Sequence, residues 1–167
     1  MNNKQKYVIE KIAQRARKLM VDKSIIKAED CLITDEQIAE IFRSFGGSLE
    51  LKDDLRGTKI KKTKENEFVV YYCEKSSPLD KLHELGHAFF DLPSMEVGDT
   101  YPCDGTEEND IVASLFSRSF YMPRDPFEMA TIRCSINGKC DVKKVAEIYN
   151  VDCFDILTRG EELNIWR

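Results

Sequence analysis

The sequence has 167 residues, a net charge of -5 and a pI near 5.2. This length suits one compact domain that buries a core without cross-links. The acidic balance excludes a global basic field that would attract nucleic acid or an anionic membrane. No apolar run reaches the roughly 20 residues that span a bilayer, and basic residues interrupt the N-terminus where a secretion signal would be apolar. We therefore expect a cytoplasmic protein.

The six cysteines contain no CxxC pair, which argues against a cysteine-rich structural zinc site. In a protein without a secretion signal, reduced thiols are the expected state. Cys134 and Cys140 flank Ile136-Asn137-Gly138, a sequence that is typical of a turn.

Two helices are expected first. Residues 4–20 place apolar side chains at helical spacing and lysines and arginines outside, so residues 1–30 form an N-terminal amphipathic helix and a linker. Thr34 begins the second helix, whose positive end suits Asp35 and Glu36, and Gly46-Gly47 ends it.

Three strands are expected next, as a short and partly antiparallel sheet packed on helices. Residues 48–51 alternate, and residues 58–62 are polar and rich in lysine, as an exposed edge strand would be. Residues 67–73 are β-branched and aromatic throughout, which predicts a more buried strand.

The rest of the chain is predicted to be mainly helical, which makes the fold class α+β. Residues 78–90 form a helix with Pro78 in its first turn, and residues 91–106 form a long loop. Further helices are expected over 107–122, 126–134, 142–149 and 152–163. We expect residues 31–125 to form the core and residues 126–167 to form a helical segment packed on it.

The chemistry of the chain is concentrated in KLHELGHAFF, residues 81–90. His83 and His87 are four residues apart and share one face of a helix, so both imidazoles can reach one metal ion. Glu84 follows the first histidine and can reach a water molecule on that ion. This is the HExxH pattern of zinc hydrolases. These are also the only two histidines of the chain.

A catalytic zinc ion needs three protein ligands, and without a third histidine the remaining ligand must be a carboxylate or a cysteine. Asp110 is the favoured ligand, because its helix face also carries Ala113, Ser114, Ser117 and Tyr121 and is mostly small. Such a face allows close approach to the helix of residues 78–90. The other candidates in this part of the chain are Asp91, Cys103, Asp104, Glu107 and Glu108. Asp91 also suits a supporting position behind a ligand.

HELGH, followed by an acidic helix that runs into DIVASLFSRSFYMP, resembles the ImmA/IrrE family of metallopeptidases. Ala113, Phe116, Met122 and Pro123 match the family's second motif, and Asp110 falls at the position of its metal-binding glutamate. The resemblance covers roughly residues 34–166. Three positions depart from the family pattern: Asp110 replaces glutamate, Ser114 replaces an acid or amide, and Ser117 replaces alanine.

The resemblance implies a small zincin-like, gluzincin-like core and a cytoplasmic zinc endopeptidase of phage or other mobile-element origin. It also implies a protein substrate, a helix-turn-helix repressor of a mobile element or a stress response. In the expected mechanism His83, His87 and Asp110 hold one Zn²⁺ ion and Glu84 is the general base for the attacking water. A tyrosine such as Tyr72 or Tyr121 would stabilise the oxyanion.

The alternative is a metal-binding regulatory or interaction protein with weak or no protease activity. Residues 145–163 resemble a helix-turn-helix, which would associate with DNA. However, Asp152, Asp155, Glu161 and Glu162 make the would-be recognition helix acidic, and phosphate contacts dominate affinity for DNA. Direct nucleic-acid binding is therefore not expected, and neither is a membrane partner.

Overall fold

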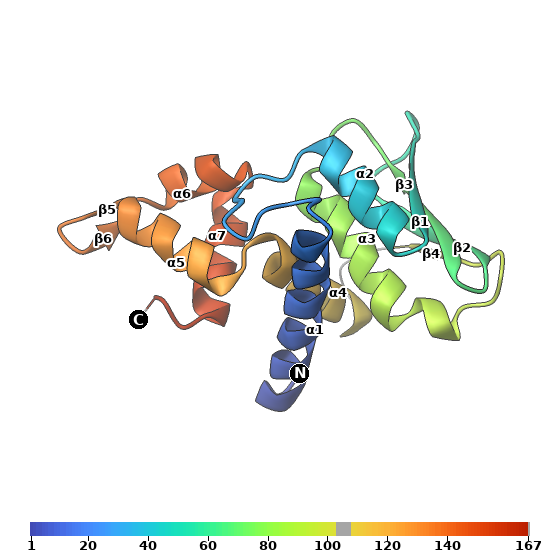
Figure 1. Ribbon diagram of the computed structural model, residues 1–167, viewed down its shortest axis with the longest axis horizontal. Helices are drawn as coiled ribbons and strands as arrows, with labels where there is room; N and C mark the ends of the chain where they lie inside the picture. The colour runs from blue at the N-terminus through green and yellow to red at the C-terminus, as the bar shows by residue number, and fades with distance from the viewer. Residues whose placement is uncertain (103–107, 167) are drawn as a thin grey trace.

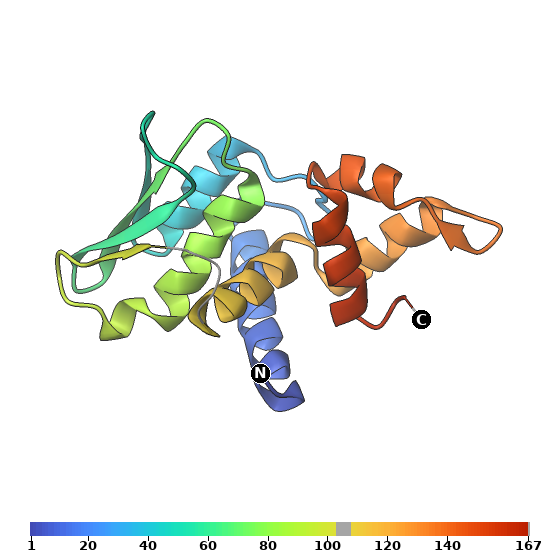
Figure 2. The same cartoon turned by 180° about the vertical axis from the view of Figure 1, so that it is seen from behind.

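The structure of the chain is a computed structural model that describes residues 1–102 and 108–166. A small mixed sheet lies at one end of the molecule and the C-terminal helices lie at the other (Figure 1). The remaining helices lie between these two parts, as the view from behind also shows (Figure 2). The described residues contain seven α-helices and a four-stranded sheet, which confirms the α+β class.

The sheet has the strand order β1-β3-β2-β4. Its strands are β1 (Gly47–Leu51), β2 (Lys59–Lys64), β3 (Glu67–Tyr72) and β4 (Thr100–Pro102). β1 runs parallel to β3, whereas β2 runs antiparallel to both of its neighbours. β3 is the buried strand that its aromatic and β-branched residues predict.

Two expectations about the sheet were wrong. The sheet has four strands instead of three, because the segment of residues 91–106 that was predicted to be a loop contains β4. The same segment contains a 3-10 helix, η1 (Leu92–Ser94). Its residues 103–106 lie outside the described residues. β2 is not an exposed edge, since it lies between β3 and β4, with Ile60 and Lys62 buried. Lys62 avoids an unpaired buried charge because its Nζ donates to the carbonyl oxygen of Met95 at 3.0 Å.

The first two helices begin as the sequence predicts. α1 (Asn3–Asp22) begins after Asn2 and α2 (Asp35–Ser44) begins after Thr34. In both, the residue before the helix and a glutamine three positions later satisfy each other's backbone N–H groups.

α1 packs along α4 with one face buried, as its periodicity predicts. Arg17 is an exception to the expectation that the basic residues of this helix lie outside, because only 4% of it is exposed. Its guanidinium donates to the carbonyl oxygens of Phe120, at 3.0 Å, and of Asp30, at 2.7 Å. Arg17 thereby ties α1 to the end of α4 and to the linker that follows α1.

α3 (Pro78–Phe90) and α4 (Glu108–Tyr121) form the centre of the molecule. α3 contacts the sheet through β2 and β3 and lies against α4, while α4 also contacts α1 and α7. The apolar face of α4 is buried at Leu115, Phe116 and Phe120, whereas Ile111 near the start of the helix is 50% exposed.

The C-terminal segment contains α5 (Arg124–Arg133), α6 (Val142–Tyr149) and α7 (Cys153–Glu162). α5 begins two residues before the predicted start, since the first turn of a helix accepts Pro126. The predicted turn at residues 136–138 joins a two-stranded hairpin of β5 (Ser135–Ile136) and β6 (Lys139–Cys140). The five described cysteines are free thiols: Cys31, Cys73, Cys134, Cys140 and Cys153.

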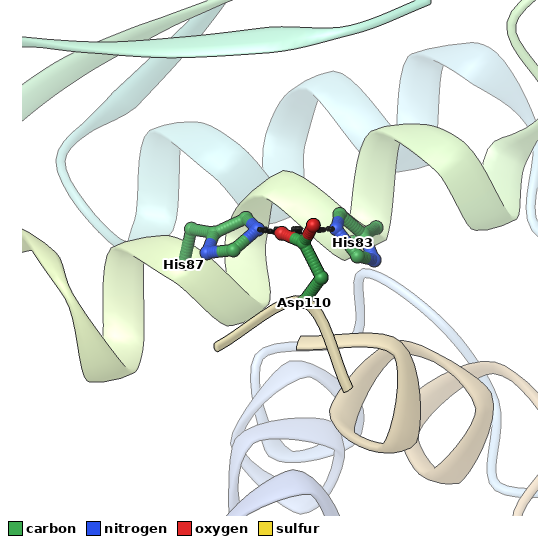
Figure 3. Close-up of side chains that lie close together, drawn as sticks. All are labelled: His83, His87 and Asp110. Carbon is green, nitrogen blue, oxygen red and sulfur yellow. Dashed lines mark hydrogen bonds and ion pairs between the residues drawn. The ribbon is translucent and has the colours of Figure 1, made fainter. Parts of the chain in front are cut away.

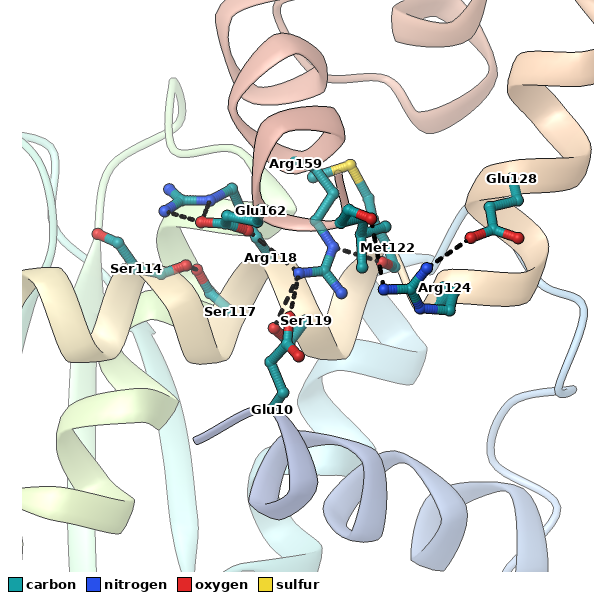
Figure 4. A network of polar contacts seen from close by, with 11 residues as sticks. Glu10, Ser114, Ser117, Arg118, Ser119, Met122, Arg124, Glu128, Arg159 and Glu162 are labelled. Atoms are coloured by element: carbon teal, nitrogen blue, oxygen red, sulfur yellow. Dashed lines mark hydrogen bonds and ion pairs between the residues drawn. The ribbon is translucent and has the colours of Figure 1, made fainter. Parts of the chain in front are cut away.

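A buried polar network joins α7 to α4 and α1 (Figure 4). Arg159, which is 1% exposed, donates to the carbonyl oxygen of Met122 at 2.9 Å and to Ser119 Oγ at 3.2 Å. It also forms ion pairs of 3.1 Å with Glu10 and Glu162. Glu162 in turn accepts two hydrogen bonds from Arg118 of α4, at 2.9 and 2.7 Å. Buried and partly buried charges of opposite sign therefore alternate across this junction.

Among the residues that the structure describes, none of the helices combines the length and the apolar character needed to cross a bilayer.

Candidate metal centre

α3 carries both histidines and is fixed firmly at its start. Ser77 Oγ accepts from the backbone N–H of Asp80, and Asp80 Oδ2 accepts from the backbone N–H of Ser77. Pro78 occupies the first turn, where its missing N–H has no cost. The middle of the helix is apolar on most sides, and Glu84 and His87 are both completely buried.

α4 approaches α3 closely because both helices have small side chains where they meet. A Cβ atom added to Gly86 would lie 2.7 Å from the Cα of Ala113 and 2.9 Å from its carbonyl oxygen. Only glycine therefore fits at this position of the HELGH sequence. The expectation that small residues on α4 allow close approach to α3 is confirmed, and this approach allows the short side chain of Asp110 to reach the histidines.

His83, His87 and Asp110 converge on one point between the two helices (Figure 3). The Nε2 atoms of the two histidines are 3.1 Å apart, and Asp110 Oδ1 lies 3.1 Å from His87 Nε2 and 3.9 Å from His83 Nε2. Both His87 and Asp110 are buried, whereas the side chain of His83 is 17% exposed. The group therefore has one partly open side, at His83.

The hydrogen bonds behind the histidines direct both Nε2 atoms into the centre. His87 Nδ1 lies 2.6 Å from Asp91 Oδ2, and an ionised carboxylate only accepts, so Nδ1 carries the proton and Nε2 presents a lone pair. Ser114 Oγ lies 3.1 Å from His83 Nδ1 and supports the same orientation. Burial, and secondarily the neighbouring His87, lower the pKa of His83 to about 4, which favours the neutral imidazole that binds metals.

This donor set suits a metal ion. Lone pairs on two nitrogens and a carboxylate oxygen repel one another at these distances, and either a proton or a metal cation between them relieves this repulsion. Ligands at about 2.0–2.1 Å from a tetrahedral zinc ion are about 3.3 Å apart. Two of the three separations here are close to this value, at 3.1 Å, and the third, from Asp110 to His83, is 3.9 Å. Two imidazoles and one carboxylate also bind iron(II), so the donor set indicates a class of ions. The buried group of His83, His87 and Asp110 can bind a metal ion.

Glu84 follows His83 on α3, and its side chain contacts Thr58. Its Oε1 accepts a hydrogen bond of 2.6 Å from the hydroxyl of Thr58, which directly precedes β2. Thr58 and His83 line one cleft of about 360 Å³, together with residues of α3, α4 and α7. The open side of the metal centre therefore faces a cleft large enough for one or two amino-acid side chains.

The other candidates that the structure describes, Asp91 and Glu108, do not join this group. Asp91 ends α3 and supports His87 from behind, while Glu108 is exposed and lies in a groove beside α1. Cys103, Asp104 and Glu107 lie outside the described residues.

Neither tyrosine proposed for the oxyanion lines the cleft at His83. Tyr121 is completely buried, and its hydroxyl donates to the carbonyl oxygen of Tyr149 at 2.8 Å. Tyr72 lies in another cavity, where the ammonium group of Lys81 is 4.5 Å from its ring. The expectation failed because the sequence gives no register between these tyrosines and α3.

Two residues at the centre were missed by sequence reasoning. Thr58 appeared to be one of several polar residues of an exposed strand, and Tyr101 was assigned to a loop. The Tyr101 ring lies 4.5 Å from the His87 ring, centroid to centroid, because β4 pairs with β2 beside α3. No local signal identifies either residue, since both reach the centre through pairing of the sheet.

Comparison with known protein-family models finds no match, and a search of curated proteins finds no similar chain.

Proposed function

We propose that this chain is a zinc-dependent endopeptidase of the ImmA/IrrE type. The observation that carries the proposal is the convergence of His83, His87 and Asp110 beside Glu84, at a cleft that His83 also lines. Two imidazoles and a carboxylate are the ligands of one class of catalytic zinc site, which retains an open position. A glutamate that follows the first histidine is the general base of peptidases with this spacing.

Zinc at this centre would act as a Lewis acid and lower the pKa of a coordinated water towards about 7. The chain supplies the remaining functions. Glu84 would accept a proton during attack on a peptide carbonyl and deliver it to the leaving amine. Asp91 and Ser114 hold the imidazoles of His87 and His83 in orientation, and the cleft would receive the peptide next to His83.

The proposed substrate is a protein, a helix-turn-helix repressor of a mobile element or stress response. Support for this class comes from the resemblance of HELGH and residues 110–123 to the ImmA/IrrE metallopeptidases. The acidic N-terminal part of α7 supports a protein partner over DNA, because Asp152 and Asp155 would repel phosphates.

The test combines metal analysis with incubation of the protein with candidate helix-turn-helix repressors. The wild type should contain about one equivalent of zinc and cut one of these repressors at one site. Glu84→Gln should keep its zinc but lose cleavage by about 10²–10⁴-fold, the usual contribution of a general base. Asp110→Ala should lose both zinc and cleavage, while Glu161→Gln, an exposed substitution on α7, should change neither.

Loss of zinc in Glu84→Gln would show that Glu84 is a metal ligand and not the general base. Full zinc affinity in Asp110→Ala would place the third ligand elsewhere in the chain.

The second candidate is a metal-binding regulatory protein that does not cut. It is favoured by the burial of Glu84, which is 0% exposed, and by the replacement of the family's glutamate by Asp110. One equivalent of tightly bound zinc, with an intact repressor after long incubation, would establish this candidate.

A further inference from the structure

We propose that Thr58 is the residue that positions the carboxylate of Glu84. This inference deepens the proposed function, because it assigns a supporting role at the same centre to a residue that belongs to neither sequence motif. Thr58 is separated from Glu84 by 26 positions and approaches it only through the fold.

The contact between the two side chains is short and sheltered from solvent. Thr58 Oγ1 donates to Glu84 Oε1 at 2.6 Å, the distance expected when a hydroxyl donates to a charged oxygen. Thr58 is 9% exposed and Glu84 is 0% exposed, so water competes weakly for the bond. Because a carboxylate group is planar, holding Oε1 fixes the orientation of both of its oxygens.

Thr58 is itself well fixed by its place in the chain. The next residue, Lys59, pairs with Tyr71 of β3 and with Pro102 of β4, so the backbone is held from both sides. Gly57 precedes it with φ of +88°, a conformation that glycine adopts readily and that turns the chain into β2. Threonine is also stiff at χ1, which restricts the direction of its hydroxyl.

This arrangement gives the catalytic carboxylate a support outside its own helix. α3 sets the position of the Glu84 backbone relative to His83, and Thr58 sets the angle of the side chain. Thr58 also lines the cleft together with His83, so the sheet and α3 meet the proposed substrate at one place. Misplacement of a catalytic group by about 1 Å can reduce turnover about 10²-fold.

The experiment compares Thr58→Val, which keeps the shape and removes the hydroxyl, with Thr58→Ser, which keeps the hydroxyl. Thr131→Val is the matched control, because Thr131 is 5% exposed and its hydroxyl donates to the carbonyl of Glu128 on α5. Thr58→Ala replaces Thr58→Val if the latter does not fold. Kinetics use a quenched-fluorescent peptide that the wild type cleaves.

Thr58→Val should lower kcat about 10–100-fold with little change in KM, and should keep about one equivalent of zinc. Thr58→Ser should recover most of kcat, and Thr131→Val should match the wild type. A rise in KM alone would identify Thr58 as a substrate contact and overturn the proposal. Unchanged kcat in Thr58→Val would overturn it as well.

A second readout does not depend on turnover. In cobalt-substituted protein, the visible absorption bands report the geometry and ligands of the ion, including the effect of a neighbouring carboxylate. Thr58→Val should shift these bands towards those of Glu84→Gln, whereas Thr58→Ser and Thr131→Val should leave them unchanged. If the wild type cuts nothing but the bands shift, the protease function fails while the positioning role of Thr58 is supported. If the wild type cuts nothing and the bands do not shift, the protease function and the positioning role both fail.

Discussion

Both sides of α4 carry buried polar side chains, but the two sides differ in how these side chains are paired. On the side of α7, Arg159 and Arg118 alternate with Glu10 and Glu162, so that each charge contacts one of opposite sign. On the side of α3, His83, His87 and Asp110 direct nitrogen and oxygen atoms at one point. The first junction is satisfied by the protein itself, whereas the second has the composition of a cation site.

The difference shows how the same helix can serve stability and chemistry. At the α7 junction, removal of one charge leaves its partners buried without an opposite charge, which lowers the free energy of unfolding. At the α3 junction, the close contact between Gly86 and Ala113 sets the distance from Asp110 to the two histidines, so a substitution there should also change the affinity for a metal ion. Substitutions on the two sides of α4 should therefore separate stability from metal affinity.

The largest effect is expected for Arg159→Met. It removes the central cation of the α7 junction and should lower the free energy of unfolding by about 3–5 kcal/mol, the usual cost of breaking a buried pair. Urea denaturation measures this loss, while zinc content per folded molecule should stay at one equivalent. Lys18→Met, which breaks an exposed pair with Asp22, should cost under about 1 kcal/mol. Equal losses in the two variants would contradict the comparison.

Gly86→Ala should be next in size. The added methyl group meets the backbone of Ala113, so it forces α3 and α4 apart and should cost about 1–3 kcal/mol. Zinc affinity should fall with it, as a competition titration against a chelator would show. The matched control is Gly160→Ala on α7, where the added group meets the side chain of Trp166 near the chain end. That variant should lose stability but keep its affinity for zinc.

Asp91→Ala should weaken zinc binding about 10–100-fold, because His87 loses the carboxylate that orients it. Isothermal titration calorimetry provides the measurement. Asp91→Asn should lose less, since its amide oxygen can still accept the hydrogen bond from Nδ1. If both variants bind zinc as tightly as the wild type, the orientation of His87 must be set by its packing alone.

The smallest effect concerns Asp155, which lines the cleft from α7. Burial, and then the neighbouring Asp152, raise its pKa to about 6 from the ordinary 3.8. Between pH 4 and pH 6 the folded state therefore binds more protons at Asp155 than the unfolded state does. The contribution of Asp155 to the free energy of unfolding falls as the pH rises from about 4 to about 6. Asp155→Asn should stabilise the protein by about 1 kcal/mol at pH 7 and by little below pH 4. Thermal unfolding at both pH values measures this, and the same gain at both would contradict it.

Much of the helical architecture was predictable because helices are specified locally. The cap at Thr34, the proline at residue 78 and the apolar periodicity place α1 to α4 within a few residues. β4 was missed because three residues that include a proline carry no strand signal of their own. β2 was wrongly predicted to be an edge strand, because its lysines are typical of an exposed strand. In the structure β4 pairs with its other side.

The spacing in HELGH was enough to predict that His83 and His87 share one face of a helix, with Glu84 next to His83 in the same turn. The absence of a third histidine indicated a carboxylate or a cysteine as the remaining ligand, and the small face of the helix that carries Asp110 favoured that residue. The packing of α3 against α4 was needed to show that, among the described candidates, Asp110 lies with the two histidines and Asp91 lies behind His87. The tertiary structure alone brought Thr58 to Glu84. Contacts such as that between Thr58 and Glu84 depend on how distant segments pair and pack, and local sequence patterns do not specify the register of that pairing.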